Sequence, residues 1–281
     1  MAGRQSPLRG PSRAARLLLA TVLLLAGCTV TAPGADDAPT PVELRVLQVN
    51  LCSSGLAGCH TGEAPARAAE LVRVERPHVV TLNEACRDDL ELLRSAMAAV
   101  HGDDAVAPAF APARNRRTGG PYHCLNGQEY GVGVVAHVPT GDRGHAVHSG
   151  IYPAQDPDDP EERAWLCVEA GSAYHACTTH LAYTSSTLAL AQCNHLLGTA
   201  IPQLHADGRY LPTVVSGDLN LRHGGDPDVR ACVPVDYQHR HDGGVQQFMA
   251  TDDLPVAATR AIGMEGTTDH PAFLVTLTLT H

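Results

Sequence analysis

Lysine is absent from this 281-residue chain, so all 20 of its basic residues are arginines. Thirty acidic residues outnumber them and give a formal net charge of −10 at pH 7. This balance disfavours a protein that binds nucleic acid mainly through a basic face. Aromatic residues make up only 4% of the chain and charged residues 18%, which fits neither a disordered acidic tail nor a coiled coil.

Hydrophobic runs long enough to cross a bilayer are also missing from the body of the chain. A shorter run from Leu17 to Leu25 follows four arginines and leads into Ala26-Gly27-Cys28. A basic stretch, a short apolar run and small residues are typical of an export signal. The run has about half the length that a membrane span needs, so it does not predict a transmembrane helix.

The segment 25–28 resembles the lipobox of bacterial lipoproteins, in which the cysteine carries the lipid and begins the mature chain. We therefore expect a signal peptide at 1–27, a lipid-anchored flexible tether at 28–41 and one domain at 42–281. Cleavage as a plain signal peptide is the alternative. Removal of residues 1–27 would take away four arginines and no acidic residue, so the mature chain would have a net charge of −10 − 4 = −14. We expect an exported monomer that is either secreted or held at the extracellular face of the cell membrane through Cys28 alone.

The cysteine content agrees with export. Nine cysteines leave an even set of eight when Cys28 is set aside, and an even number in an exported chain indicates disulfides. No Cys-x-x-Cys spacing occurs, so a zinc site made of thiolates is a weaker alternative. Spacing suggests two pairs, Cys52 with Cys59 around a Ser/Gly loop, and Cys167 with Cys177 across a hairpin.

Several predicted strands lead directly into polar residues. These residues are Asn50, Asn83-Glu84, His180 and Gly217-Asp218-Leu219-Asn220, and Asp269-His270 precedes the last strand. Helical patterns at 63–75, 88–100 and 188–205 alternate with the strands, which predicts a layered α/β or α+β domain. Each polar residue alone could form a turn or a cap, but five such positions together indicate a site at one edge of a sheet.

In this order, the five segments resemble the motifs of the endonuclease/exonuclease/phosphatase superfamily, whose members are similar to pancreatic deoxyribonuclease. The segments are Leu47-Gln48-Val49-Asn50, Leu82-Asn83-Glu84, Thr179-His180-Leu181, Gly217-Asp218-Leu219-Asn220 and Thr268-Asp269-His270-Pro271. The resemblance covers about residues 44–279. It implies a four-layer sandwich of two packed, mainly antiparallel sheets flanked by helices. It also implies hydrolysis of a phosphate ester with a divalent metal, Mg²⁺ or Mn²⁺.

The resemblance also implies a metal site. Glu84 is the first choice of metal ligand, with Asn50 supplying a neutral oxygen beside it. Asp269 would be a second ligand or a partner of His270. The chemistry needs such a site, because a phosphodiester repels an attacking hydroxide and the negative charge that develops on its leaving oxygen must be neutralised. A hard cation bound by carboxylate and amide oxygens meets both needs.

The remaining motif residues receive catalytic roles by the same likeness. Asp218 would orient or deprotonate the attacking water, and Asn220 would hydrogen-bond the substrate. His270 would act as a general base or hold the phosphate. His180 would donate a hydrogen bond to a nonbridging phosphate oxygen as charge builds there. A carboxylate beside either histidine would favour its protonated form, but the sequence does not show which one has such a neighbour.

One segment departs from the superfamily pattern. Members often carry an Ile-Asp-Tyr-like strand before the final Asp-His, and its Asp helps to position catalytic groups. The matching stretch at 245–248 places Gln246 where that Asp is expected, with Asp236 or Asp242 as compensating carboxylates if the register differs. Glutamine keeps the hydrogen bonding but removes the charge. This change motivates an alternative of another class, a catalytically inactive, disulfide-braced surface binding module.

The substrate is less specified than the reaction. Arg114, Arg116 and Arg117 lie in a Gly- and Pro-rich loop and are the best candidates for contacts to substrate phosphates, with a solvated loop as the alternative. A nuclease or general phosphodiesterase ranks first. A sphingomyelinase-like lipid phosphodiesterase ranks second, since no aromatic-rich apolar insertion is evident. The absence of lysine counts against a phosphomonoesterase of inositol phosphates.

Overall fold

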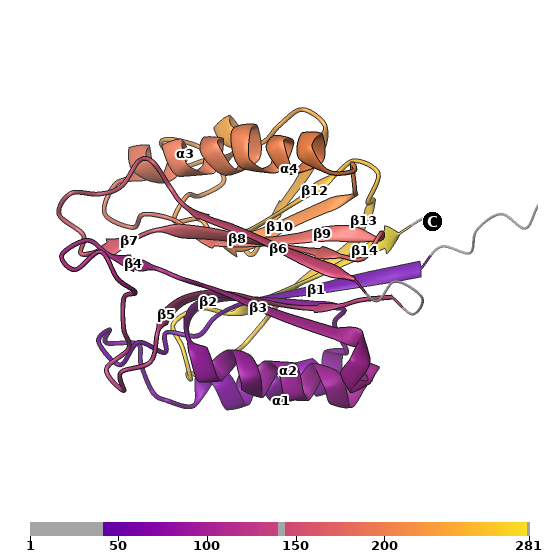
Figure 1. Cartoon of the computed structure of the whole chain (residues 1–281), viewed down its shortest axis with the longest axis horizontal. Helices are drawn as coiled ribbons and strands as arrows, with labels where there is room; N and C mark the ends of the chain where they lie inside the picture. Colours follow the sequence, from indigo (N-terminus) through magenta and orange to yellow (C-terminus); the bar gives the residue numbers. More distant parts are fainter. Residues whose placement is uncertain (1–41, 140–143, 280–281) are drawn as a thin grey trace, which may run out of the picture. The chain divides into compact units, whose positions relative to one another are not determined.

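The computed structural model describes residues 42–139 and 144–279, so Cys28 and the predicted signal and tether lie outside the described residues. The described chain forms four layers, with two six-stranded sheets packed face to face and helices on both outer sides (Figure 1). Within each sheet one neighbouring pair, β1–β2 or β9–β10, is parallel and the other neighbours are antiparallel. The predicted fold class is confirmed.

The first sheet has the strand order β13–β14–β1–β2–β5–β3. In that order its strands are Val256–Ile262, Ala272–Leu279, Val42–Asn50, Val79–Cys86, Tyr130–His137 and Val106–Pro112. The second sheet has the order β11–β12–β10–β9–β8–β6. Its strands are Tyr237–His241, Gln246–Thr251, Thr213–Asp218, Tyr174–His180, Ala164–Ala170 and His145–Ile151. Two short strands, β4 (Arg114–Asn115) and β7 (Glu161–Glu162), pair separately.

Helices cover the outer face of each sheet. On the first sheet lie α1 (Ala64–Glu75) and α2 (Arg87–His101), and on the second lies α3 (Ser186–His195), which runs through a π-helical turn at Leu196–Ala200 into α4 (Ile201–Asp207) (Figure 1). The 3-10 turns are η1 (Asp103–Ala105) and η3 (Val229–Cys232). The helical patterns predicted at 63–75, 88–100 and 188–205 match these segments to within one or two residues at each end.

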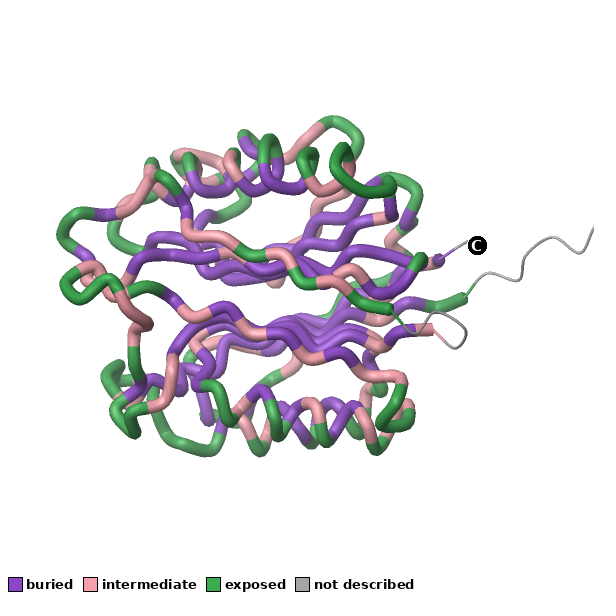
Figure 2. The backbone as a smooth tube through the Cα atoms, viewed as in Figure 1, coloured by how far each residue is buried: buried purple, intermediate pink, exposed green. Residues whose placement is uncertain are grey.

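The apolar core consists of three layers that alternate with the backbone layers. One lies between the two sheets, one beneath α1 and α2, and one beneath α3 and α4, while the outer faces of the helices are largely exposed (Figure 2). Each large apolar side chain that leaves water contributes about 1.5–3 kcal/mol to this packing. Both faces of each sheet are therefore covered, which explains the nearly continuous apolar runs of β2 and β5.

All eight cysteines of the described residues form disulfides: Cys52–Cys59, Cys86–Cys124, Cys167–Cys177 and Cys193–Cys232. Both predicted pairs are confirmed, and the second joins directly opposed residues of β8 and β9. Four disulfides indicate an oxidising, extracytoplasmic environment. Within the residues that the structure describes, no helix has both the length and the apolarity needed to cross a membrane.

A band of buried polar side chains interrupts the apolar layer between the sheets. Gln48 of β1 donates from Nε2 to Oδ1 of Asn83 at 2.6 Å, and its Oε1 accepts a hydrogen bond from Thr81 of β2. The Thr81 hydroxyl also lies 2.6 Å from the hydroxyl of Ser216 in β10, on the facing sheet. Because each of these groups is fully buried, every hydrogen bond that they lack would cost free energy.

Asn83 joins the two sheets at the end of this band. Its Oδ1 accepts from the backbone N–H of Asp218 at 2.6 Å, and its Nδ2 donates to the backbone carbonyl of Thr179 at 3.0 Å. The side chain of a β2 residue thus fixes the backbones of β10 and β9 at the points where those strands end. A slip of one residue between the sheets would leave these buried backbone groups without partners.

We expect Asn83→Ala to lower the free energy of unfolding by about 3 kcal/mol, because it leaves several buried groups unsatisfied. Asn194→Ala, in the exposed face of α3, is the matched control and should change the free energy by no more than about 0.5 kcal/mol. Urea unfolding monitored by circular dichroism measures both. Equal stabilities for the two variants would show that the inter-sheet hydrogen bonds of Asn83 contribute nothing.

Candidate functional site

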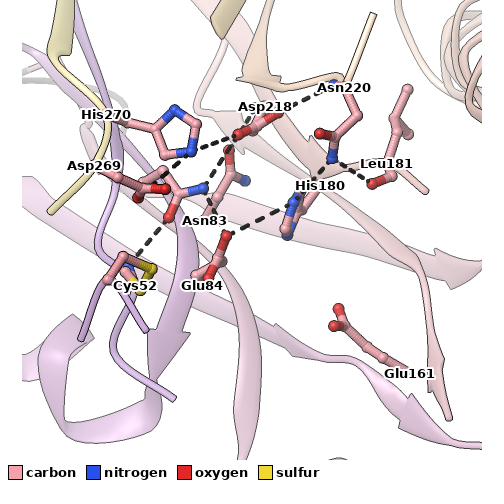
Figure 3. A network of polar contacts seen from close by, with 12 residues as sticks. Cys52, Asn83, Glu84, Glu161, His180, Leu181, Asp218, Asn220, Asp269 and His270 are labelled. Carbon is pink, nitrogen blue, oxygen red and sulfur yellow. Dashed lines mark hydrogen bonds and ion pairs between the residues drawn. A yellow bond between two sulfur atoms is a disulfide. The ribbon is translucent and has the colours of Figure 1, made fainter. Parts of the chain in front are cut away.

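A cleft of about 480 Å³ opens at the end of the two sheets where β2, β9 and β10 terminate. Six of the polar residues singled out in the sequence line it together (Figure 3): Glu84, His180, Asp218, Asn220, Asp269 and His270. Asn50, fully buried at the end of β1, contacts two of them from below. The structure thus brings together residues from five separate segments of the chain.

Glu84 enters the cleft through a β-bulge. The pairing of β2 with β5 passes from Leu82 opposite Gly133 to Ala85 opposite Gly131, so β2 contains one extra residue. Within that bulge Glu84 has a φ of 52°, in the left-handed region that a glutamate rarely adopts. Such conformations cost about 1 kcal/mol or more and concentrate at functional sites, where they redirect a side chain.

The carboxylates of Glu84 and Asp218 are linked through Asn50. The Nδ2 of Asn50 donates to Oε1 of Glu84 at 2.8 Å and to Oδ2 of Asp218 at 3.2 Å. Its Oδ1 accepts from the backbone N–H of Cys52 at 3.1 Å, so the amide nitrogen, not the oxygen, faces the two carboxylates.

Both carboxyl groups resist ionisation. Burial raises the pKa of Glu84; the hydrogen bond from Asn50 opposes this rise, and the charge of Asp218 adds to it. Burial also raises the pKa of Asp218, against the opposing charge of His270. Because both carboxyl groups accept hydrogen bonds from the same amide nitrogen, they lie near enough for a positive charge between them to be favourable.

His270 stands at the other side of Asp218. Its Nε2 lies 3.5 Å from Oδ2 of Asp218 and 3.7 Å from Oδ1 of Asp269. The Asp218 side chain is buried, whereas that of Asp269 is 58% exposed. The imidazole therefore lies between a buried and an exposed carboxylate, a position from which it can exchange a proton with a group in the cleft.

His180 has a cationic neighbour that the sequence motifs did not indicate. The Nη1 of Arg163 lies 3.0 Å from Nδ1 of His180, and the Arg163 side chain is only 3% exposed. Burial lowers the pKa of His180 well below its ordinary value, and the charge of Arg163 lowers it further. Both effects favour the neutral imidazole of His180.

Gln246 lies opposite Asp218 in the β10–β12 pairing, and it is fully buried. Neither its Nε2 nor its Oε1 has a hydrogen-bond partner among the residues that the structure describes. The position where the superfamily often has an aspartate thus carries an uncharged amide directly below the cleft. Leaving the amide unpaired costs about 1–3 kcal/mol for each buried group.

The three arginines predicted to bind substrate phosphates do not line the cleft. Arg114 is paired with Glu162 of β7. Arg116 lies 3.4 Å from the other oxygen of the same carboxylate and donates to the backbone carbonyl of Asp156 at 2.6 Å. Arg117 is exposed. The sequence showed three positive charges but not the acidic residues that partner two of them.

The donor set of the cleft fits a hard divalent cation. The carboxylates of Glu84, Asp218 and Asp269 offer oxygen ligands, the type that Mg²⁺ and Mn²⁺ prefer. The buried Asp159 and the half-buried Glu161 line the same cleft together with Arg163, so acidic side chains outnumber the single arginine among the described residues that line it, and a cation would reduce their repulsion of a phosphate ester. The sulfur atoms of Cys52 and Cys59, which lie near Asp269, are joined in a disulfide and cannot act as thiolate ligands.

No protein-family model matches the sequence, and a search of curated proteins finds no sequence relative. Solved structures do match. An endonuclease/exonuclease/phosphatase family protein from Bacteroides thetaiotaomicron superposes with a TM-score of 0.62 over 87% of this chain and 99% of that chain, at 13% identity. The fold is that of the endonuclease/exonuclease/phosphatase superfamily. The superfamily protein from Beutenbergia cavernae gives a TM-score of 0.60 at 18% identity, over 84% of this chain and 72% of that one.

The human nocturnin catalytic domain, solved with bound sulfate, is a further example of the superfamily fold. It matches with a TM-score of 0.62 at 14% identity, covering 86% of this chain and 94% of that chain. Identities this low show a shared fold and not a shared activity. The endonuclease/exonuclease/phosphatase fold is one used by metal-dependent phosphoesterases.

Several residues of the cleft were not identified from the sequence. Besides Arg163, they include Asp159, Glu161, Tyr122, Tyr130 and Tyr183. All lie outside the strand-end motifs, and only their packing brings them to the cleft. Glu161 and Asp159 contact the Arg163 guanidinium at 3.1 Å and 3.0 Å, so they form one buried ionic group with it.

Glu161 makes a pH-dependent contribution to stability. Burial raises its pKa from 4.5 to about 7, with Asp159 and Glu84 adding to the rise and Arg163 opposing it. The folded protein therefore keeps a proton that the unfolded chain has already released, and the free energy of unfolding falls as pH rises from about 4.5 to 7. One such group contributes a slope of at most about 1.4 kcal/mol per pH unit.

We expect Glu161→Gln to remove this slope, so that the variant gains stability over the wild type as pH rises through the window. Urea unfolding at a series of pH values measures the difference. Glu70→Gln, at an exposed position of α1, is the matched control and should follow the wild-type curve. A difference between wild type and Glu161→Gln that stays constant with pH would contradict the assignment.

Proposed function

We propose that the protein is a divalent-metal-dependent hydrolase of phosphate esters, with a phosphodiester as its substrate and Mg²⁺ or Mn²⁺ as its cofactor. The observation that carries this proposal is that Glu84 and Asp218 lie in one cleft with the imidazoles of His180 and His270. A buried and a half-buried carboxyl group with raised pKa values favour a bound cation, and the imidazoles can move protons beside it.

Glu84 would hold the cation, with Asp269 and Asp218 next to it. The cation would neutralise charge on the phosphate group and on the leaving oxygen. His270, 3.5 Å from Asp218, is positioned to exchange a proton with a water molecule that Asp218 orients. His180 and Asn220 would donate hydrogen bonds to phosphoryl oxygens as charge develops there.

A nucleic acid or another phosphodiester with a flat aromatic group is the substrate class that we place first. Tyr183 lines the cleft with 67% of its surface exposed, and one face of its ring lies over the Arg163 guanidinium at 5.6 Å. Exposed aromatic faces of this kind stack bases of single-stranded nucleic acids. The internal pairing of Arg114 and Arg116 weakens the case for a long polyanionic substrate.

A lipid phosphodiesterase is the second candidate, and one observation favours it. Two loops at the cleft, each attached by a disulfide, expose Leu56 (58%) and Leu125 (74%). The loops touch, since a backbone hydrogen bond joins Leu125 to Ser54. Exposed leucines beside a catalytic cleft suit contact with an apolar surface.

The proposal includes the cellular location of the protein. The four disulfides support an oxidising compartment, and we propose that Cys28 anchors the protein to the extracellular face of the membrane by lipidation. This anchor rests on the sequence pattern alone, because residues 1–41 lie outside the described residues.

We expect Mg²⁺- or Mn²⁺-dependent hydrolysis of bis-p-nitrophenyl phosphate, abolished by chelation and lowered about 10²–10⁴-fold by His270→Ala. His145→Ala, at an exposed position of the edge strand β6, is the matched control and should keep wild-type activity. Parallel assays with single-stranded DNA and with sphingomyelin vesicles separate the two substrate classes. Absence of hydrolysis in Mg²⁺, Mn²⁺ and Ca²⁺ would contradict the proposal and favour the inactive binding module suggested by Gln246.

A further inference from the structure

Arg163 makes an unusual contact with a histidine ring of the cleft. A guanidinium group carries only N–H donors, so at 3.0 Å its Nη1 can form a hydrogen bond only with a nitrogen that has a free lone pair. The Nδ1 of His180 must therefore be unprotonated. A neutral imidazole with an unprotonated Nδ1 carries its single proton on Nε2.

We propose that Arg163 is a positioning residue that holds His180 in the Nε2–H tautomer, so that this N–H faces the cleft as a donor for a phosphoryl oxygen of the substrate. The inference rests on the proposed function for the identity of the acceptor. The tautomer itself follows from the contact between Arg163 and His180 and can be tested without substrate or metal.

No acceptor among the neighbouring groups of the described chain occupies the Nε2–H. The Nδ2 of Asn220 lies 3.2 Å from Nε2; one of its two N–H groups donates to the backbone carbonyl of Leu181 at 2.9 Å, and the other faces Nε2, so a donor lies at each ring nitrogen of His180. A neutral ring accepts from only one of them, and the shorter contact from the charged Arg163 is the stronger. The N–H groups of Nε2 and Asn220 then meet without an acceptor between them. Oε1 of Glu84 lies 3.9 Å from Nε2, beyond hydrogen-bond distance. Figure 3 shows both groups around the His180 ring. The N–H thus remains available to a ligand in the cleft.

Arg163 is itself fixed before any substrate arrives. Its Nη2 donates to Oδ2 of Asp159 at 3.0 Å, and its Nη1 lies 3.1 Å from Oε1 of Glu161. The ring of Tyr183 covers the guanidinium carbon. A planar guanidinium group that is held on several sides presents each N–H in a constant direction. The flexible ammonium group of a lysine does so less well. A donor oriented in advance requires no reorganisation during the reaction.

The direct test is the protonation state of the two ring nitrogens of His180 at neutral pH. Long-range ¹H–¹⁵N correlation spectra of the full-length protein labelled with ¹⁵N-histidine report it, with His180→Gln identifying the signals by their loss. We expect a protonated Nε2 and an unprotonated Nδ1. A protonated Nδ1 would overturn the proposal, whereas loss of phosphodiesterase activity alone would count only against the proposed function.

Variants at Arg163 test whether this side chain sets the tautomer of His180. Arg163→Met removes the donor, so we expect the Nδ1–H tautomer to appear and kcat to fall about 10–100-fold with little change in KM. Arg163→Lys keeps a charged donor and should restore the Nε2–H tautomer and part of kcat. Arg94→Met, on the exposed side of α2, is the matched control.

An unchanged tautomer in Arg163→Met would show that Arg163 does not set it, and the proposal would fail. Should Arg163→Met not fold, the ring-nitrogen signals of the wild type still decide the proposal, because a protonated Nδ1 is incompatible with the donor of Arg163 at that atom. Circular dichroism establishes which variants are folded.

Discussion

The hydrogen bonds of Asn83 across the two sheets are the constraint on which the rest of the site depends. This β2 side chain accepts from the backbone of Asp218 and donates to the backbone of Thr179, next to His180. The strand ends that supply the cleft are thereby fixed relative to one another by polar contacts inside an apolar layer. Apolar packing alone would tolerate small shifts between the sheets, but buried hydrogen bonds do not.

The same rigidity allows the cleft to hold several groups whose placement there is energetically unfavourable. Asp218 is buried and Glu84 half-buried, and both are carboxyl groups with raised pKa values; Glu84 also has a strained backbone, and Gln246 is a buried amide without a hydrogen-bond partner among the described residues. Each feature is unfavourable in isolation, and the surrounding layers and disulfides stabilise the fold against them. A bound cation would reduce the repulsion between the two carboxylates.

The strand-end residues were predictable because short runs rich in apolar and β-branched residues mark the strands, and polar residues that directly follow them gather at one sheet edge. The two disulfides between near neighbours were predictable from the short spacing of their cysteines along the chain. Cys86–Cys124 and Cys193–Cys232 were not, because tertiary packing brings these cysteines together. Arg163 could not be found, because its importance lies in burial against Asp159 and Glu161. Conversely, the pairing of Arg114 with Glu162 across β4 and β7 is invisible in the order of charges along the chain.

We infer that the hydrogen bonds of Asn83 between the sheets position Glu84 to hold a divalent cation. Anomalous scattering from crystals of the protein grown with Mn²⁺ tests this inference most directly. We expect a single strong Mn²⁺ peak in the cleft, coordinated by the Glu84 carboxylate, and its loss in crystals of Glu84→Gln. A peak only at other positions, or none in the cleft at saturating Mn²⁺, would contradict a cation site at Glu84.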